Sequence, residues 1–351
     1  MLRYWPTLSE TFVARELVEL ERRGVAVSVA RIGARDDGRL ADELPRCRVV
    51  QPSVRDHVKA LWEKGGLDEP LRLRHRLRAK ALGSWAARER VDRIHAHFVG
   101  EASAWARLAA GVAQIPWSVT AHAVDLYRPF PTAGVHLREA RPAIVVSEAG
   151  ATYAEQRFGI RPQVVRCGIR LPVETAKPST DDRTLSLVTV ARWTEKKGLP
   201  GLIDLVRSDS TLRLRIIGDA PDEVASARIE VGSLPPSQVS RELLRHDLFV
   251  LPCRIASSGD RDGIPVALME AMAVGLPVVS TRVGGVPELV DDDVGWLISP
   301  DSPSQLREAV EEARDPRKRR ARGRAARLRV EADRWTVERQ VDELLQAWGA
   351  P

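Results

Sequence analysis

The chain has 351 residues, 44% of them apolar, and carries 54 Lys and Arg against 48 Asp and Glu. This length exceeds one ordinary core and fits two domains of roughly 150 to 180 residues each, and the apolar content excludes a disordered chain. The cysteines Cys47, Cys167 and Cys253 lack the close spacing of a zinc or redox motif. We find no signal peptide and no apolar run of roughly 18 residues, so we expect a protein of the reducing cytoplasm without a membrane span.

The positive charge is concentrated in two segments. Residues 53–90 sum to +5 and residues 313–329 to +8, whereas the rest of the chain sums to −7. Solvated helix faces would explain both segments. The functional alternatives are contact with an anionic membrane surface or a phosphate-bearing substrate. Nucleic acid is disfavoured because neither segment carries the interleaved aromatic residues of a single-strand binder.

In chain order, short β-branched runs alternate with segments of helical period, which is typical of parallel sheets with crossover helices. We therefore predict an α/β fold with domains at 1–170 and 184–334, a polar linker at 171–183 and a helix within 335–351. Helices are predicted over 10–23, 102–111, 265–274 and 304–314. Strands are predicted over 25–33, 115–122, 142–148, 162–169, 185–192, 212–219, 247–253 and 276–281.

Histidines mark two strand ends in the first domain, in IHAHF (94–98) and SVTAHAVDLY (118–127). Open α/β sheets bind ligands at this edge, which makes His122 a candidate; a strand-end histidine with satisfied hydrogen bonds is the alternative. For His95 and His97 that structural alternative is favoured. We expect these two to point to opposite faces of their strand with no third ligand nearby, so a metal site is disfavoured.

The second domain opens with the strand LSLVTV and the loop VARWTEKKGL (190–199). Arg192 and Lys197 leave the strand on one loop, where a planar guanidinium and a mobile ammonium can converge on a diphosphate. Surface decoration is the alternative for such a pair on its own.

The helix predicted over 265–274 follows a polar loop that ends in Asp262 and Gly263. Free amides at a helix start, here near Gly263 and Ile264, can hold phosphate, and Glu270 can accept two hydrogen bonds from a ribose. A helix-start charge and a surface glutamate are the structural alternative.

The order and spacing of these segments resemble family 4 retaining glycosyltransferases with the GT-B fold, in particular their bacterial exopolysaccharide branch. The segment DGIPVALMEAMAVGLPVVST (262–281) resembles the family pattern of two glutamates separated by seven residues, followed by Ala-Met-Ala-x-Gly-x-Pro-Val. The resemblance implies that Glu270 binds the ribose and that Asp262, one methylene shorter than the family's glutamate, lies by the sugar hydroxyls. Arg192 and Lys197 match the family's diphosphate-binding Arg and Lys, with Ala191 in place of its usual glycine.

Further segments extend the resemblance over nearly the whole chain: IIGD (216–219), VGSLP (231–235) and GGVPELV (284–290). It implies that Gly232, Ser233 and Leu234 lie by the nucleotide base. In the first domain it implies that His122 contacts the transferred sugar near the reacting carbon. The acceptor-side residues it implies are Ser9, Glu10, His97 and Asp125, of which Ser9 also reads as a helix N-cap.

The start of the chain departs from the family. Only MLRY precedes PTLSETF (6–12), so the first strand is nearly absent and the family's glycine-rich first loop is missing. We expect either a trimmed start or an unusually built acceptor side.

The resemblance implies two Rossmann-like domains facing across a cleft, the last helix returning to the first domain, and transfer of a sugar with retention. The donor is expected to be a UDP-sugar ahead of GDP-sugars, without metal or other cofactor, and the acceptor a lipid-linked polysaccharide intermediate or a small natural product. The enzyme would be cytoplasmic or peripheral at the inner membrane face. An epimerase or phosphorylase is disfavoured because no lysine-anchored pyridoxal motif is present. A non-catalytic binding or regulatory subunit is the alternative of another class.

Overall fold

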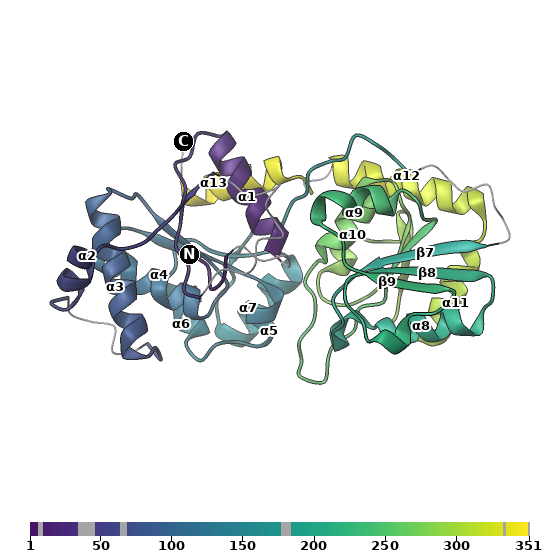
Figure 1. Ribbon diagram of the computed structural model, residues 1–351, viewed down its shortest axis with the longest axis horizontal. Coiled ribbons are helices and arrows are strands. Elements are labelled where there is room, and N and C mark those ends of the chain that lie inside the picture. Colours follow the sequence, from purple (N-terminus) through teal and green to yellow (C-terminus); the bar gives the residue numbers. More distant parts are fainter. Residues whose placement is uncertain (6–9, 34–45, 64–68, 177–183, 333–334, 350–351) are drawn as a thin grey trace. The chain divides into compact units, whose positions relative to one another are not determined.

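The computed structural model describes residues 1–5, 10–33, 46–63, 69–176, 184–332 and 335–349. The chain forms two compact units (Figure 1). Unit 1 contains Met1–Arg166 and Gln340–Pro351, and unit 2 contains Cys167–Arg339. Most of the last helix, α13 (Val337–Trp348), therefore belongs to unit 1, as the predicted fold class led us to expect.

A parallel sheet forms the centre of unit 2. Within the described residues it has six strands in the order β12-β11-β10-β7-β8-β9. Its strands are nearly continuous apolar runs, as expected of a parallel sheet that is covered on both faces; every residue of β10 is buried. The strands are β7 (Leu185–Val190), β8 (Leu212–Ile217), β9 (Ile229–Gly232), β10 (Leu248–Leu251), β11 (Val278–Thr281) and β12 (Gly295–Ile298).

Helices cover both faces of this sheet (Figure 1). One face carries α8 (Leu199–Ser208) and α11 (Pro303–Glu312), and the other carries α9 (Pro236–Leu243), α10 (Val266–Ala273) and α12 (Pro316–Ala332). Short 3₁₀ turns, η3 (Glu195–Lys197), η4 (Asp222–Val224) and η5 (Val286–Glu288), follow β7, β8 and β11. The crossover helices bring every strand's carboxyl end to one edge, where ligands of such sheets bind.

Unit 1 is built around parallel strands as well. In its described part, β3 (Ile94–His97), β4 (Trp117–Ala121), β5 (Ala143–Val145) and β6 (Gln163–Val164) lie in that order, and β1 (Ser28–Val29) pairs with β2 (Arg48–Val49). The predicted strand 25–33 is thus much shorter than expected. The start of the chain lies between the two sheets, because Leu2 bridges to Arg31 and the Met1 amino group donates to the His95 carbonyl at 2.6 Å.

The helices of unit 1 pack on these strands as separate apolar clusters. One cluster joins α1 and α13 to β1, and another joins α3 and α4 to the four-stranded sheet. The helices are α1 (Thr11–Arg22), α2 (Val54–Ala60), α3 (Leu73–Arg88), α4 (Glu101–Ala113), α5 (Ala123–Tyr127), α6 (Ala133–Glu139) and α7 (Glu148–Phe158). Among the described helices of both units, none combines the length and the apolar character needed to cross a bilayer.

Candidate functional site

The predicted phosphate-binding residues lie at the point in unit 2 where the strand order reverses. From β7 the chain continues outward through β8 and β9, and it then returns to β10 on the other side of β7. The loops after two adjacent strands therefore diverge at the β7/β10 boundary, which is where open α/β sheets bind ligands. Arg192 and Lys197 follow β7, and Asp262 lies in the loop that follows β10.

The two loops are joined by an ion pair between predicted site residues. Lys197 Nζ donates to Asp262 Oδ2 at 2.6 Å, and Lys196 Nζ lies 3.4 Å from the other carboxylate oxygen. The loops pack closely because Gly198 has a φ of +65° and a Cβ there would lie 2.0 Å from the Pro252 carbonyl oxygen. The sequence predicted Lys197 and Asp262 as separate ligands, and the structure brings them into direct contact.

Burial strengthens the electrostatic attraction between the Lys197 ammonium and the Asp262 carboxylate. Burial disfavours charge on Asp262, but the ammonium groups of Lys197 and Lys196 overcome this and hold the pKa of the carboxyl below its usual value. Burial likewise opposes charge on Lys197, yet Asp262 raises the pKa of this amine, with the charge of Arg192 acting in the opposite direction. Burial and the neighbouring Asp262 also raise the pKa of the Cys253 thiol above its usual range, so Cys253 Sγ donates to the carboxylate at 3.4 Å.

A glycine turn after β11 supports the backbone of this site. Gly285 N donates to the Gly263 carbonyl at 2.9 Å. Gly284 has a φ of +55°, and a Cβ at this position would lie 2.1 Å from the Asp262 carbonyl oxygen. The segment GGVPELV, which reads as a plain turn, therefore fixes the position of Asp262 and Gly263.

The remaining predicted residues of unit 2 lie at strand ends or in the segments that follow the strands. The Arg192 side chain is exposed, and the loop beside it is held by Trp193 N, which donates to Asp219 Oδ1 at 2.9 Å after β8. Glu270 is half-buried on α10, and half-buried Ile264 precedes this helix. Gly232 ends β9 and is followed by exposed Ser233 and half-buried Leu234.

In unit 1 the predicted His97 and His122 belong to one hydrogen-bonded chain. Glu16, on α1, accepts from Gln340 Nε2 and lies 3.0 Å from His97 Nε2. His97 Nδ1 lies 3.3 Å from His122 Nε2. This distance allows one hydrogen bond between the two rings, so His97 links Glu16 to His122.

The surroundings of His122 keep its ring neutral and fixed. Burial and the neighbouring His97 lower the pKa of His122 well below its usual value. The ring centroid lies 4.8 Å from that of Phe12 and 4.6 Å from that of Phe98. Asp125 accepts from His122 N at 2.8 Å and from Val99 N, and burial raises the pKa of Asp125 to about 7 against these amides. Asp125 therefore positions the His122 backbone at the start of α5.

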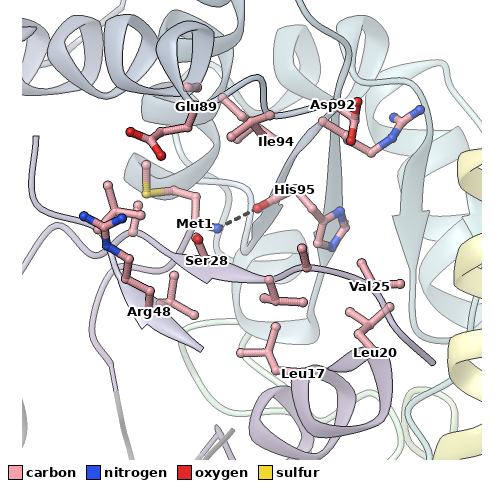
Figure 2. A pocket seen from close by; sticks show the side chains of 18 of the residues that line it. Met1, Leu17, Leu20, Val25, Ser28, Arg48, Glu89, Asp92, Ile94 and His95 are labelled. Atoms are coloured by element: carbon pink, nitrogen blue, oxygen red, sulfur yellow. Dashed lines mark hydrogen bonds between the residues drawn. The ribbon is translucent and has the colours of Figure 1, made fainter. Parts of the chain in front are cut away.

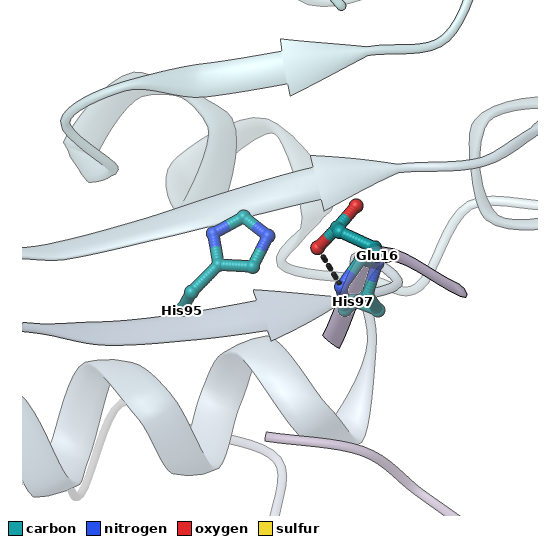
Figure 3. Close-up of side chains that lie close together, drawn as sticks. All are labelled: Glu16, His95 and His97. Atoms are coloured by element: carbon teal, nitrogen blue, oxygen red, sulfur yellow. Dashed lines mark hydrogen bonds and ion pairs between the residues drawn. The ribbon is translucent and has the colours of Figure 1, made fainter. Parts of the chain in front are cut away.

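The expectation that His95 and His97 point to opposite faces was wrong. Residues two apart on a strand share a face, and the two ring centroids lie 4.9 Å apart. A third group is also present, because ligand atoms of Glu16, His95 and His97 all lie within 4.8 Å of one another (Figure 3). These groups could hold a divalent cation, but both His95 ring nitrogens already contact hydroxyls, Ser118 Oγ at 2.8 Å and Thr120 Oγ1 at 3.1 Å.

The start of α1 differs from the prediction. Glu10 occupies the N-cap position and its side chain makes no capping hydrogen bond. Ser9, which was predicted as an N-cap and an acceptor-side residue, lies outside the described residues. Glu10 itself is half-buried.

A cavity of about 620 Å³ opens in unit 1 between β1, β3, α1 and α3. Its wall is mainly apolar, with Leu17, Leu20 and Val25 on one side and Ile94 on another (Figure 2). The cluster of Glu16, His95 and His97 borders it. No motif in the sequence predicts this cavity.

Three residues of the two sites were missed by sequence reasoning. Lys196 and Cys253 contact Asp262, and Glu16 contacts His97. Lys196 adjoins a predicted ligand and could have been considered. Glu16 reads as an ordinary helix glutamate, and only its position on the apolar face of α1 beside buried Leu17 and Leu20 signals a buried carboxylate.

Comparison with known proteins extends over both units. Residues 9–171 match Glycosyltransferase Family 4, and residues 173–329 match Glycosyl transferases group 1. The amylovoran biosynthesis glycosyltransferase AmsK of Erwinia amylovora is 36% identical over 169 residues, which are 44% of this chain and 40% of that protein. The putative colanic acid biosynthesis glycosyltransferase WcaL of Escherichia coli is 37% identical over 205 residues, 52% of this chain and 50% of the relative. The chain thus spans about half the length of these relatives.

Solved structures share the fold at low sequence identity. Anabaena Alr3699/HepE, in complex with UDP and glucose, has a TM-score of 0.77 at 18% identity, with 100% of this chain and 98% of that chain covered. A glycosyltransferase from Rickettsia africae has a TM-score of 0.73 at 15% identity, with 99% and 97% covered. The two family matches adjoin one another and include the histidines of both strand ends, the Arg192 loop and the helix that carries Glu270. The chain belongs to glycosyltransferase family 4 and has the GT-B fold.

Proposed function

We propose that the protein is a glycosyltransferase that moves a sugar from a nucleotide-diphosphate donor to an acceptor hydroxyl with retention. The observation that carries this proposal is the cluster of cations around the buried Asp262 carboxylate at the strand-order reversal of unit 2. Such an edge suits a charged nucleotide, and the exopolysaccharide relatives favour transfer in polysaccharide biosynthesis.

In this proposal the cations of unit 2 stabilise the leaving group. The bond between the anomeric carbon and the β-phosphate oxygen breaks, negative charge develops on the diphosphate, and Arg192 and Lys197 offset that charge without a metal ion. The amides of Gly263 and Ile264 add a partial positive charge. The acceptor oxygen bonds to the anomeric carbon, and its proton passes to the departing phosphate.

Other residues are assigned by the family resemblance. Glu270 would bind the ribose, Gly232 to Leu234 the base, and Asp262 the sugar hydroxyls. His122, whose buried ring is neutral, is the unit 1 residue that we propose for contact with the sugar. A UDP-sugar is the proposed donor, in keeping with the UDP-glucose bound to Anabaena Alr3699/HepE. The proposed acceptor is a lipid-linked polysaccharide intermediate ahead of a small natural product, with a basic segment in contact with the membrane.

A panel of UDP- and GDP-sugars, read by thermal shift and by slow donor hydrolysis, tests the proposal. Arg192→Ala should weaken binding of the selected donor about 10- to 100-fold, the range for one lost charge-assisted hydrogen bond. Arg317→Ala, at an exposed arginine of α12, is the matched control and should leave binding unchanged. If no donor stabilises or is hydrolysed and Arg192→Ala changes nothing, the transferase proposal is refuted.

A second candidate is a protein that binds the nucleotide sugar without turnover. The 2.6 Å pair between Lys197 and Asp262 favours it, because the carboxylate competes with the diphosphate for the ammonium. Donor binding without hydrolysis, and without transfer in a broad acceptor screen, would support this candidate. In that case Asp262→Glu, which restores the side-chain length of the family's glutamate, is the variant that should be tested for regained turnover.

A further inference from the structure

The α2 segment exposes large apolar side chains while it buries a carboxylate. Asp56 and Ala60 are each only 1% exposed and form the inward face. Large apolar side chains are exposed on α2 and directly after it: Val54 is 81% exposed, Val58 52%, Leu61, the C-cap, 65%, and Trp62 84%. These positions follow the i, i+4, i+7, i+8 spacing of one helical stripe. A helix of a soluble surface normally places such a stripe inward.

Strong polar contacts hold α2 in this orientation. Asp56 forms a capping box with Ser53, in which Ser53 N donates to Asp56 Oδ2 at 2.7 Å. The other Asp56 oxygen pairs with Arg88 near the end of α3, and the Arg88 contact holds the pKa of Asp56 at about 2 despite burial. Lys80 Nζ donates to the Glu63 carbonyl at 2.6 Å beyond the end of α2. The exposed stripe is therefore a fixed feature of the α2–α3 hairpin.

Four exposed cations accompany the stripe on α2 and at the start of α3. Arg55 and Lys59 on α2, and Arg72 and Arg74 at the start of α3, are exposed. None of these four side chains pairs with another residue in the described part of the chain. Leu73, the first residue of α3, is 71% exposed and adds an apolar side chain among them. Exposed Trp, Leu and Val together with unpaired Lys and Arg are the composition of a segment that lies in the interface of an anionic bilayer.

In the other basic segment, on α12, many cations contact residues of unit 2. Arg319 donates to the Ala313 carbonyl, Arg327 pairs with Glu331, and Arg329 pairs with Asp291. Among the described residues of α12, Leu328 is the one large apolar side chain that is exposed. Many of its cations therefore hold unit 2 together, and the charge of α12 has no matching apolar stripe.

We propose that the α2–α3 hairpin docks unit 1 on an anionic lipid bilayer, with Leu61 and Trp62 inserted among the headgroups and Arg55, Lys59, Arg72 and Arg74 over the lipid phosphates. Each such cation adds about a fivefold gain in binding to anionic lipid. This inference specifies which residues make the membrane contact of the proposed function. It rests on that proposed function for the lipid-linked acceptor. It assigns that contact to residues 54–62 and 72–74 and not to α12.

Sedimentation with vesicles of phosphatidylcholine and 30% phosphatidylglycerol, against phosphatidylcholine alone, tests the assignment on the full chain. Wild type should bind the anionic vesicles and lose binding as salt rises. The double variant Leu61→Ser, Trp62→Ser should bind at least tenfold more weakly, with an unchanged melting temperature because both residues are exposed. Leu328→Ser is the matched control on α12 and should change binding less than twofold.

Trp62→Leu separates insertion from folding. This variant should still sediment with anionic vesicles but lose most of the fluorescence quenching that brominated lipid tails cause in wild type. The assignment is overturned if wild type does not bind, if the double variant binds like wild type, or if Leu328→Ser has the larger effect. A wild-type dimer that Trp62→Ser dissociates would make the stripe an interface between copies and would also overturn it. Donor thermal shifts measured on the same variants should be unchanged, so failure of the donor proposal is seen separately.

Discussion

Replacing Lys197 with Met tests whether the Lys197–Asp262 pair organises the donor side of unit 2. Methionine keeps the apolar stem and removes the ammonium that lies 2.6 Å from the carboxylate. Removing one partner of a buried pair costs about 3–5 kcal/mol. Here Lys196 and Cys253 still contact Asp262, at 3.4 Å each, so we expect a loss of about 2–3 kcal/mol. For a unit of this size that loss corresponds to a fall in melting temperature of about 4–12 °C.

Calorimetry of the full chain, with the unit 2 transition identified by its response to donor, is the assay. Lys318→Met is the matched control, because Lys318 pairs with Glu312 at 3.2 Å and both side chains are 50% exposed. An exposed pair contributes at most about 1 kcal/mol, so the control should shift the transition by no more than about 4 °C.

A double-mutant cycle isolates the interaction between the two side chains. Asp262→Asn relieves the unpaired charge in Lys197→Met, so the double variant should be more stable than the sum of the single losses by about 1 kcal/mol or more. Additive losses within about 0.5 kcal/mol would refute the reasoning, as would a Lys197→Met shift equal to that of Lys318→Met.

Two further predictions concern the loop after β11 and the buried histidines. Gly284→Ala should lower the melting temperature of unit 2 and weaken donor binding, because its Cβ would meet the Asp262 carbonyl. The control is Gly259→Ala, at a glycine with a φ of +81° and open space around it. Equal effects of the two substitutions on donor binding would contradict the steric argument. Burial is the main cause that lowers the pKa values of His95 and His122 in the folded state. Below about pH 6.5 the unfolded state therefore binds more protons than the folded state. As the pH decreases through this range, the free energy of unfolding should fall by up to about 1.4 kcal/mol per pH unit for each histidine. Thermal melts of wild type and His95→Gln from pH 5 to 7.5 should show a shallower slope in the variant; equal slopes would exclude His95.

Much of the fold follows from local patterns in the sequence. The helix predicted over 265–274 is α10 (Val266–Ala273), and the strand predicted over 212–219 is β8 (Leu212–Ile217). Apolar periodicity predicts these two elements because the pattern of apolar positions lies within each segment itself. The strand predicted over 25–33 is reduced to Ser28–Val29, since a strand also needs neighbours with which to pair.

The site is less predictable because its contacts join distant segments. Arg192, Lys197 and Asp262 were identified by type and order, but the direct pair between Lys197 and Asp262 connects residues 65 positions apart. No local pattern contains such a pairing. The orientation of His95 and His97 was predictable, since side chains on a strand repeat every two residues, and that error came from misapplying the period.

The return of the chain to unit 1 makes unit 2 an insertion within it. In α13, Gln340 donates to Glu16, and Val341 and Leu344 are buried with residues of α1. During synthesis, residues 1–166 therefore leave the ribosome without the helix that covers α1, whereas nearly all of unit 2 emerges before that helix does. Unit 2 can complete its core first, and unit 1 closes last. A truncation before Gln340 should consequently destabilise the half of the protein in which the chain begins.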